Sequence, residues 1–286
     1  MAAPTVLPTE LPSGWAPVEQ TTGVRLSGLA AGVYPGRREI AYTPHQKRIA
    51  QDLMLAFGMG DAGSAADTWR GHSFLRMTED LITARKEPLP DLDHVLLAFQ
   101  TPDLHVGEAV GCYLTELCPG HPQSLGVSEQ GAGAPFTALK VADALVRGGV
   151  LNRGLLFVLD QTTPLQEPGT APDIHRDAAV MIDLGGEGDA ELVEYSHERT
   201  DRPALTLTEV RDRHRGVPVV VGTALAGCLP LKDLLSVSVA PADYAVTSVW
   251  FALAAMWPLK GPVLLADYDR YAGGLYTARL NPVVRS

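Results

Sequence analysis

Residues 124–160 decide the fold and read SLGVSEQGAGAPFTALKVADALVRGGVLNRGLLFVLD. The start of the stretch, 124–127, predicts a short strand, and the glycines that follow in 130–133 predict a tight turn. Apolar residues at helical spacing predict a helix over about 135–147, and the apolar run 154–159 predicts a buried strand. This order is typical of a parallel or mixed sheet whose faces are covered by helices.

The same alternation continues on both sides of this stretch. We expect further strands at 24–33, 93–99 and 178–184, and helices at 44–57, 71–86 and 106–117. Residues 1–20 contain four prolines and predict an extended lead-in. The resulting fold class is α/β.

The second part of the chain repeats this order in a shorter form. Residues 235–239 correspond to strand 124–127, 248–257 to helix 136–146, 261–266 to strand 154–159, and 275–280 to strand 178–184. Two copies of one order indicate a pseudo-twofold duplication. We therefore expect one compact domain with an N-terminal half at 21–190 and a shortened C-terminal half at 191–286.

Composition excludes several classes of protein. The 286 residues are 46% apolar, which is too much for a disordered chain. Lys and Arg number 23 against 33 Asp and Glu, and this net charge of −10 argues against a nucleic-acid partner. An anionic membrane surface is disfavoured for the same reason, and no apolar run reaches the roughly 18 residues that a spanning helix needs.

The sequence predicts no cofactor and no metal site. The eight histidines are scattered without an HExxH pattern, and GxxxxGK[ST] and GxGxxG are absent. The three cysteines cannot all pair with one another, and the N-terminus has no basic start followed by an apolar stretch. We therefore expect reduced cysteines and a cytoplasmic location.

Several segments together resemble the ketoacyl synthases of the thiolase fold. The order of elements and the apolar pattern are most similar to those of the type III enzymes. The segments are 93–101 (DHVLLAFQT), 138–160, the Arg176–Ala179 turn and the glycine-rich 263–280. The resemblance spans about residues 70–286. It implies a layered α-β-α-β-α fold with pseudo-twofold halves, the second of them shortened.

The catalytic residues that the resemblance implies are missing. The nucleophilic Cys of that family falls on Gln130, or on Gly131 one residue later, and neither can attack a thioester. The family His follows a strand that resembles 218–221, where this chain has Gly222-Thr223. The family Asn falls on Asp243-Tyr244.

The pair Glu129-Gln130 before the glycine-rich turn resembles one branch of this family, the chain-length factors. These are partner subunits of type II polyketide ketosynthases that carry Gln in place of Cys. The resemblance implies a heterodimer with a Cys-bearing ketosynthase, an indirect relation to acyl carrier protein, and no catalytic residue in this chain. The implied pocket residues are Glu129, Gln130, Gly131, Gly133, Thr223, Asp243 and Tyr244. Wall residues of an acyl tunnel would be Phe99, Tyr113, Leu114 and Phe136.

Other readings of the same residues remain open. A diverged acyltransferase or decarboxylase acting on acyl-carrier-protein thioesters could use Glu129, Gln130 or His175, which is two residues from Asp177. Gly131 and Gly133 could serve only a tight turn. Cys112, the rival nucleophile, is expected to be a buried structural thiol in mid-helix. An unrelated α/β protein with a similar rhythm is the third possibility.

Overall fold

The structure is a computed structural model that describes residues 23–35, 42–56, 71–103, 105, 107–162, 176–242 and 244–283. The extended lead-in expected at 1–20 lies outside these residues. Within them, none of the helices is both long and apolar enough to cross a bilayer.

The first half is a five-stranded sheet in the order β3-β2-β4-β5-β1. Strands β2, β3 and β4 run parallel, and β5 pairs antiparallel with both β4 and β1. The elements are β1 (Arg25–Tyr34), α1 (Pro44–Ala56), α2 (Phe74–Thr83), β2 (His94–Phe99), α3 (Val110–Leu117), β3 (Gln123–Val127), the 3-10 turn η2 (Gly131–Gly133), α4 (Ala134–Arg147), β4 (Arg153–Asp160) and β5 (Asp177–Gly185).

The second half repeats this topology in the order β6-β10-β9-β7-β8. Strands β7, β8 and β9 run parallel, and β10 pairs antiparallel with β9 and β6. The elements are β6 (Ala190–Arg199), α5 (Pro203–Arg213), β7 (Val219–Val221), α6 (Thr223–Ala226), α7 (Leu231–Leu234), β8 (Ser238–Val239), α8 (Ser248–Ala255), β9 (Val263–Asp269) and β10 (Gly274–Pro282). The predicted duplication, with its shortened second half, is confirmed.

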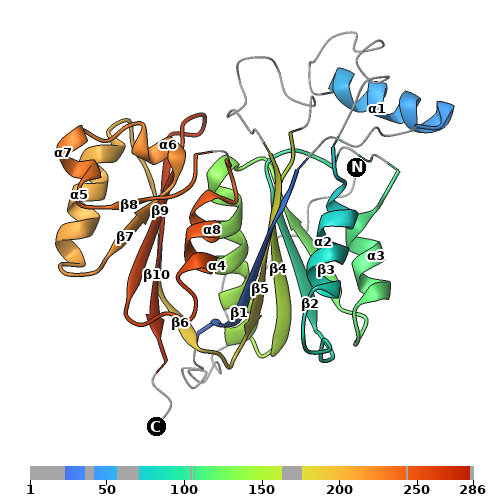
Figure 1. Ribbon diagram of the computed structural model, residues 1–286, viewed down its shortest axis with the longest axis horizontal. Helices are drawn as coiled ribbons and strands as arrows, with labels where there is room; N and C mark the ends of the chain where they lie inside the picture. The colour runs from blue at the N-terminus through green and yellow to red at the C-terminus, as the bar shows by residue number, and fades with distance from the viewer. Residues whose placement is uncertain are drawn as a thin grey trace, which may run out of the picture.

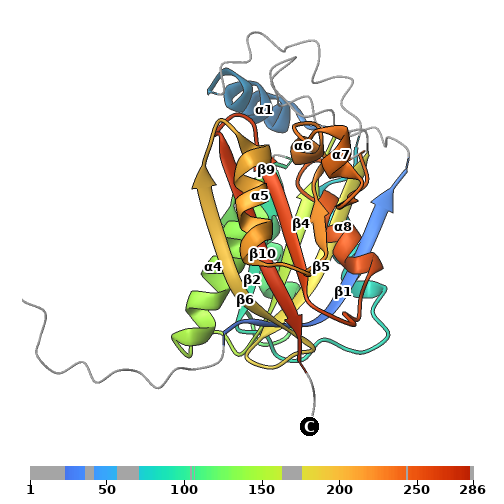
Figure 2. The same cartoon turned by 90° about the vertical axis from the view of Figure 1, so that its left-hand side faces the viewer.

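In the described part of the chain, the ladder between the two sheets has two residue pairs, both between β1 and β6, so that the sheets diverge and enclose α4 and α8 (Figure 1). Both helices contact strands of both halves. Helices α2 and α3 cover the outer face of the first sheet, and α5 lies in front of β9 and β10 in Figure 2. The result is five layers, α-β-α-β-α.

The observed elements differ from the predicted ones in several places. The helix expected from residue 106 begins at Val110. Of the strand expected at 235–239, only the two residues of β8 are extended, and α7 ends just before this range. Strand β6 was not predicted, because it alternates Glu191, Glu194 and Glu198 with few apolar residues. It pairs with β10 along its length but with β1 at one end only. An open edge of this kind needs little apolar character.

Phe136, in the central helical layer, is a core position at which we expect a substitution to destabilise the fold strongly. Phe136 of α4 is fully buried, and its ring centroid lies 5.3 Å from that of Trp250 of α8. We expect Phe136→Ala to lower the free energy of unfolding by about 3–5 kcal/mol, through lost burial and a residual cavity. Urea unfolding followed by tryptophan fluorescence measures this change. The exposed Leu205→Ala on α5 is the control, with less than about 0.5 kcal/mol expected. A loss below about 1 kcal/mol at Phe136 would contradict this packing.

Candidate functional site

The site centres on the turn between β3 and α4. Glu129 has a φ of 61°, which is unusual for a residue with a side chain, and Gly131 has a φ of 51°. Gln130 lies between them, directly before η2, and α4 follows with Pro135 in its first turn. The turn therefore reverses the chain sharply and presents Gln130 at the start of a helix.

The amide of Gln130 is held by a hydroxyl of α4. Thr137 Oγ1 donates a 2.6 Å hydrogen bond to Gln130 Oε1, and Tyr195 of β6 lies close to Thr137. With the amide oxygen engaged in this way, the NH2 group of Gln130 points away from Thr137. A Gln amide is neutral and does not form an acyl-enzyme, so this side chain can orient a group but cannot carry it.

The second half packs directly onto the glycines of this turn. A Cβ on Gly131 would lie 2.8 Å from the carboxyl carbon of Asp269, and a Cβ on Gly133 would overlap the ring of Tyr276. Asp269 Oδ1 in turn accepts a 2.8 Å hydrogen bond from the backbone N–H of Tyr271. Both glycines are thus required by the close approach of β9 and β10, and Gly131 also by its φ.

A buried carboxylate ties the first half to the loop before α8. Asp160, at the end of β4, accepts hydrogen bonds of 2.7–3.0 Å from the backbone N–H groups of Ala245, Val246 and Thr247 and from the Thr247 hydroxyl. Burial raises the pKa of Asp160, and the hydrogen bonds oppose that shift. The carboxylate therefore fixes the backbone that follows Tyr244.

Asp267 holds the corresponding place in β9, two residues before the end of the strand. It is buried against Gly222, accepts a 2.8 Å hydrogen bond from the N–H of Tyr268, and has a long contact of 3.4 Å from the Ser248 hydroxyl. The backbone N–H of Leu225 is a further donor to it. Burial raises its pKa to about 7, and the nearby Asp160 adds to the rise. Both carboxylates are thus buried, and Asp160 has the shorter set of hydrogen bonds from the hydroxyl and backbone donors around it.

The remaining predicted site residues lie in the second half. Thr223 begins α6, and its hydroxyl donates a 3.1 Å hydrogen bond to the carbonyl of Pro241. The ring of Tyr244 stacks on Phe251 at 4.7 Å. None of the contacts of Gln130, Thr223 and Tyr244 joins one of these three described side chains to another. Asp243 lies outside the described residues, and the side chain of Glu129 is exposed.

Two alternative catalytic groups were expected from the sequence, Cys112 and the pair His175 and Asp177. Cys112 is exposed, so the expectation of a buried thiol was wrong, because the buried face of α3 carries Leu114 and the buried thiol is Cys118. His175 lies outside the described residues. Asp177, its suggested partner, accepts hydrogen bonds from the backbone N–H and the ring Nδ1 of His72, at 2.7 and 3.0 Å. In the described part of the chain, no three His, Cys, Asp or Glu side chains are grouped as a metal site would require.

Sequence reasoning missed the carboxylates that organise the site. Asp160 and Asp267 follow the two corresponding strands, which read GLLFVLD and GPVLLAD. Comparing the halves residue by residue would have found this pair. Nothing local in the sequence predicts the contact of Asp269 with Gly131 or of Tyr195 with Thr137, because each joins residues of different halves.

Solved structures share this architecture. FabH, the 3-oxoacyl-(acyl carrier protein) synthase III of Pseudomonas aeruginosa PAO1, matches with a TM-score of 0.58 at 14% identity, over 92% of this chain and 99% of that chain. The fold is thiolase-like. A variant of OleA from Xanthomonas campestris, with bound lauric acid and lauroyl-CoA, matches at a TM-score of 0.62 and 10% identity, over 91% of this chain and 99% of that chain.

A third thiolase-like structure, the tetronic acid condensing enzyme AbyA1, matches at a TM-score of 0.60 and 14% identity, over 90% of this chain and 99% of that chain. Searches against protein-family models and curated proteins return no match. Identities this low establish the shared fold alone.

The pKa of Asp267 predicts a pH dependence of stability. A folded-state pKa of about 7 against the ordinary value of 3.8 means that the folded protein holds this proton more tightly than the unfolded chain. The contribution of Asp267 therefore favours folding below about pH 4 and is lost as the pH rises to about 7. We expect Asp267→Asn to abolish a fall of about 2–4 kcal/mol over this range.

Urea unfolding at half-unit steps from pH 4 to pH 8 measures this difference. The exposed Asp212→Asn is the matched control and should keep the wild-type pH dependence. An unchanged pH dependence in Asp267→Asn would contradict the assignment.

Proposed function

We propose that this chain is a non-catalytic ketosynthase-like subunit, similar to a chain-length factor, that pairs with a Cys-bearing ketosynthase. In this role the chain shapes the acyl tunnel used in polyketide or fatty-acyl chain synthesis. Its relation to acyl carrier protein is indirect and passes through the partner ketosynthase. One observation carries the proposal. Gln130 stands at the strand-to-helix turn of a thiolase-like fold, with its amide oxygen bound by Thr137.

The chemistry of the turn supports this proposal. Acyl transfer from a thioester needs a thiolate, and a helix N-terminus or a nearby base lowers the pKa of that thiol. The three cysteines are Cys112, Cys118 and Cys228, and none of them is in the turn. The described counterparts in the second half, Thr223 and Tyr244, carry no imidazole to act as a base near neutral pH.

The free edge of the first sheet supports a partner subunit. Among the described strands, β3 pairs with β2 alone, and it is exposed along most of its length. Leu125 on this strand is 38% exposed, and the neighbouring α3 exposes Leu117 and Tyr113 to a similar degree. An open edge beside apolar side chains is a ready template for another strand. By resemblance, thiolase-fold dimers pair through this strand.

Of the four suggested tunnel residues, two are unsuited to a tunnel wall within this chain. Leu114 and Phe136 are fully buried in separate hydrophobic clusters. Tyr113 is exposed, and Phe99 is partly buried, with its ring close to Gly126 of β3. Phe99 and Tyr113 are therefore the two side chains that a partner at the β3 edge could meet.

Co-expression with a candidate Cys-bearing ketosynthase tests the proposal. We expect a stable heterodimer in size-exclusion chromatography with light scattering, and ketosynthase products that change in chain length when Phe99 or Tyr113 is replaced by Ala. Leu125→Lys should abolish pairing, because it places a charge on the apolar edge. Leu205→Lys, on the distant α5, is the matched control and should pair normally.

The other outcomes are equally clear. A chain that stays monomeric and leaves ketosynthase products unchanged refutes the proposal. Turnover of malonyl- or acyl-loaded carrier protein by the purified chain alone, abolished in Gln130→Ala, would instead establish an acyltransferase or decarboxylase.

A further inference from the structure

Strand β6 is open along one of its two edges. It pairs with β10 along its length, whereas its ladder with β1 holds only Arg25 and Leu26. One further hydrogen bond, of 3.0 Å, runs from the N–H of Leu192 to the carbonyl of Val24. Beyond Leu192 no described strand pairs with this edge, which continues to Arg199 at the left of the second sheet in Figure 2.

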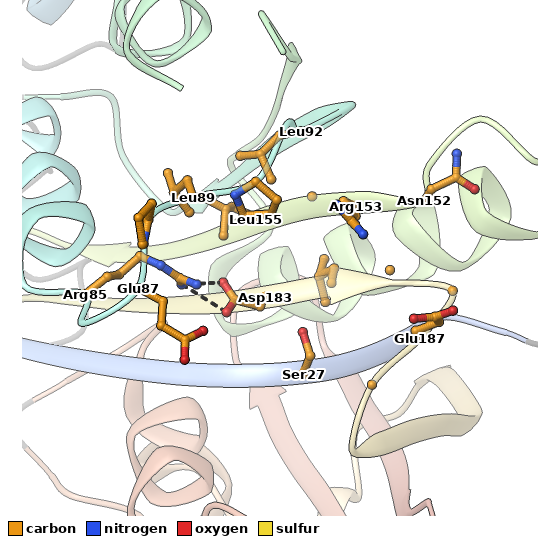
Figure 3. Close-up of a pocket in the computed structure, with 17 residues that line it drawn as sticks. Ser27, Arg85, Glu87, Leu89, Leu92, Asn152, Arg153, Leu155, Asp183 and Glu187 are labelled. Atoms are coloured by element: carbon orange, nitrogen blue, oxygen red, sulfur yellow. Dashed lines mark hydrogen bonds and ion pairs between the residues drawn. The ribbon is translucent and has the colours of Figure 1, made fainter. Parts of the chain in front are cut away.

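The ladder between β1 and β6 stops where the described chain begins, at Gly23. In the other direction β1 continues along β5, past Ser27 and the cavity of about 680 Å³ that Figure 3 shows. In an antiparallel ladder, each step back along β1 is a step forward along β6. The residues before Gly23 are therefore the part of the chain that could extend this ladder along the open edge.

Two side chains of α4 hold the chain at the start of this edge. Asp143 Oδ1 accepts a 3.0 Å hydrogen bond from the N–H of Val24, and Arg147 Nε donates to Asp143 Oδ2 at 2.8 Å. A Cβ on Gly23 would lie 2.7 Å from atoms of both side chains. The residues before Gly23 thus leave from a fixed point beside Leu192.

A bulge decides which side chains of the open edge face α4. The pairing of β6 with β10 shifts after Leu192, and Val193 has no partner on β10. Beyond this extra residue, the centroid of the Tyr195 ring lies 5.3 Å from Nζ of Lys140 on α4. His197, two residues later, faces the same layer, because side chains alternate along a strand.

Val24 sets the phase of the residues before it. Its side chain lies in the central hydrophobic cluster with that of Leu192. Side chains two and four residues earlier, Thr22 and Gln20, would therefore face α4 as well if the strand continued. With the extra residue of β6 counted, they fall beside the two side chains of the open edge that face the same way.

The sequence before Gly23 suits such an edge. Residues 18–22 read VEQTT and contain no proline, and Val and Thr favour strands. The carbonyl of Val24 faces β6, so the backbone groups of every second residue before it would face β6 too. Pro17 falls in the alternate set, where its missing N–H removes no ladder hydrogen bond.

We propose that residues 18–22 of this chain add to the open edge of β6 as an antiparallel strand. The pairs are Thr22 with Tyr195, Thr21 with Ser196 and Gln20 with His197. An open edge invites uncontrolled pairing, and a strand of the same chain removes that risk. The inference does not depend on the proposed pairing with a ketosynthase.

Hydrogen–deuterium exchange on the full chain tests the proposal with two proline variants. Gln20→Pro removes an N–H that would face β6, whereas the matched control Glu19→Pro removes one that would face away. We expect the amides of residues 195–199 to exchange about tenfold faster in Gln20→Pro and at the wild-type rate in Glu19→Pro. The amides of β3 should not change in either variant. Equal exchange of residues 195–199 in the two variants would overturn the proposal.

Paired cysteines test the register. Thr21→Cys with Ser196→Cys places two thiols directly opposite each other, within reach of a disulfide. Thr21→Cys with Glu198→Cys, one position further along the same face, is the control, because its Cα atoms would be more than about 7 Å apart. We expect an intramolecular disulfide in the first pair alone, located by mass spectrometry of peptides. No disulfide in the first pair, a disulfide in the control pair, or one that links two chains would each overturn the proposal.

Discussion

The carboxylate of Asp160 is the contact on which the arrangement of the halves depends. It is closed off from water at the end of β4, and it is satisfied by three consecutive backbone N–H groups and one hydroxyl of the other half. A buried carboxylate without these donors would cost several kcal/mol. The loop before α8 therefore has one favourable position relative to the first sheet. Helix α8 begins directly after this loop and packs against α4.

The turn at Gln130 also depends on contacts between the two halves, and here the second half supplies the side chains. Asp269 and Tyr276 of the second half pack on Gly131 and Gly133 of the first, and Tyr195 reaches Thr137. The shape of the turn is thus a property of both halves together. In the proposed role, this rigidity would let the chain present a fixed wall to a partner although it carries no nucleophile at this position.

The sequence was sufficient where local chemistry decides the structure. The turn at 130–133 needed its glycines, the helix after it had regular apolar spacing, and the buried strands were continuous apolar runs. It was insufficient where a contact joins distant residues. Strand β6 depends on its pairing with β10, and Asp177 pairs with His72 across 105 residues of chain.

The two ends of the ten-stranded sheet differ in a way that bears on assembly. Strand β3 offers five residues, none of them charged, whereas β8 at the far end has only two residues with ladder hydrogen bonds. Natural sheets usually blunt a long open edge with charge or proline to avoid uncontrolled self-association. Of the two end strands of the described sheet, β3 is the longer open edge. In the proposed role, addition of one partner strand at β3 would use this edge, and assembly would end in a closed pair and not in a fibre.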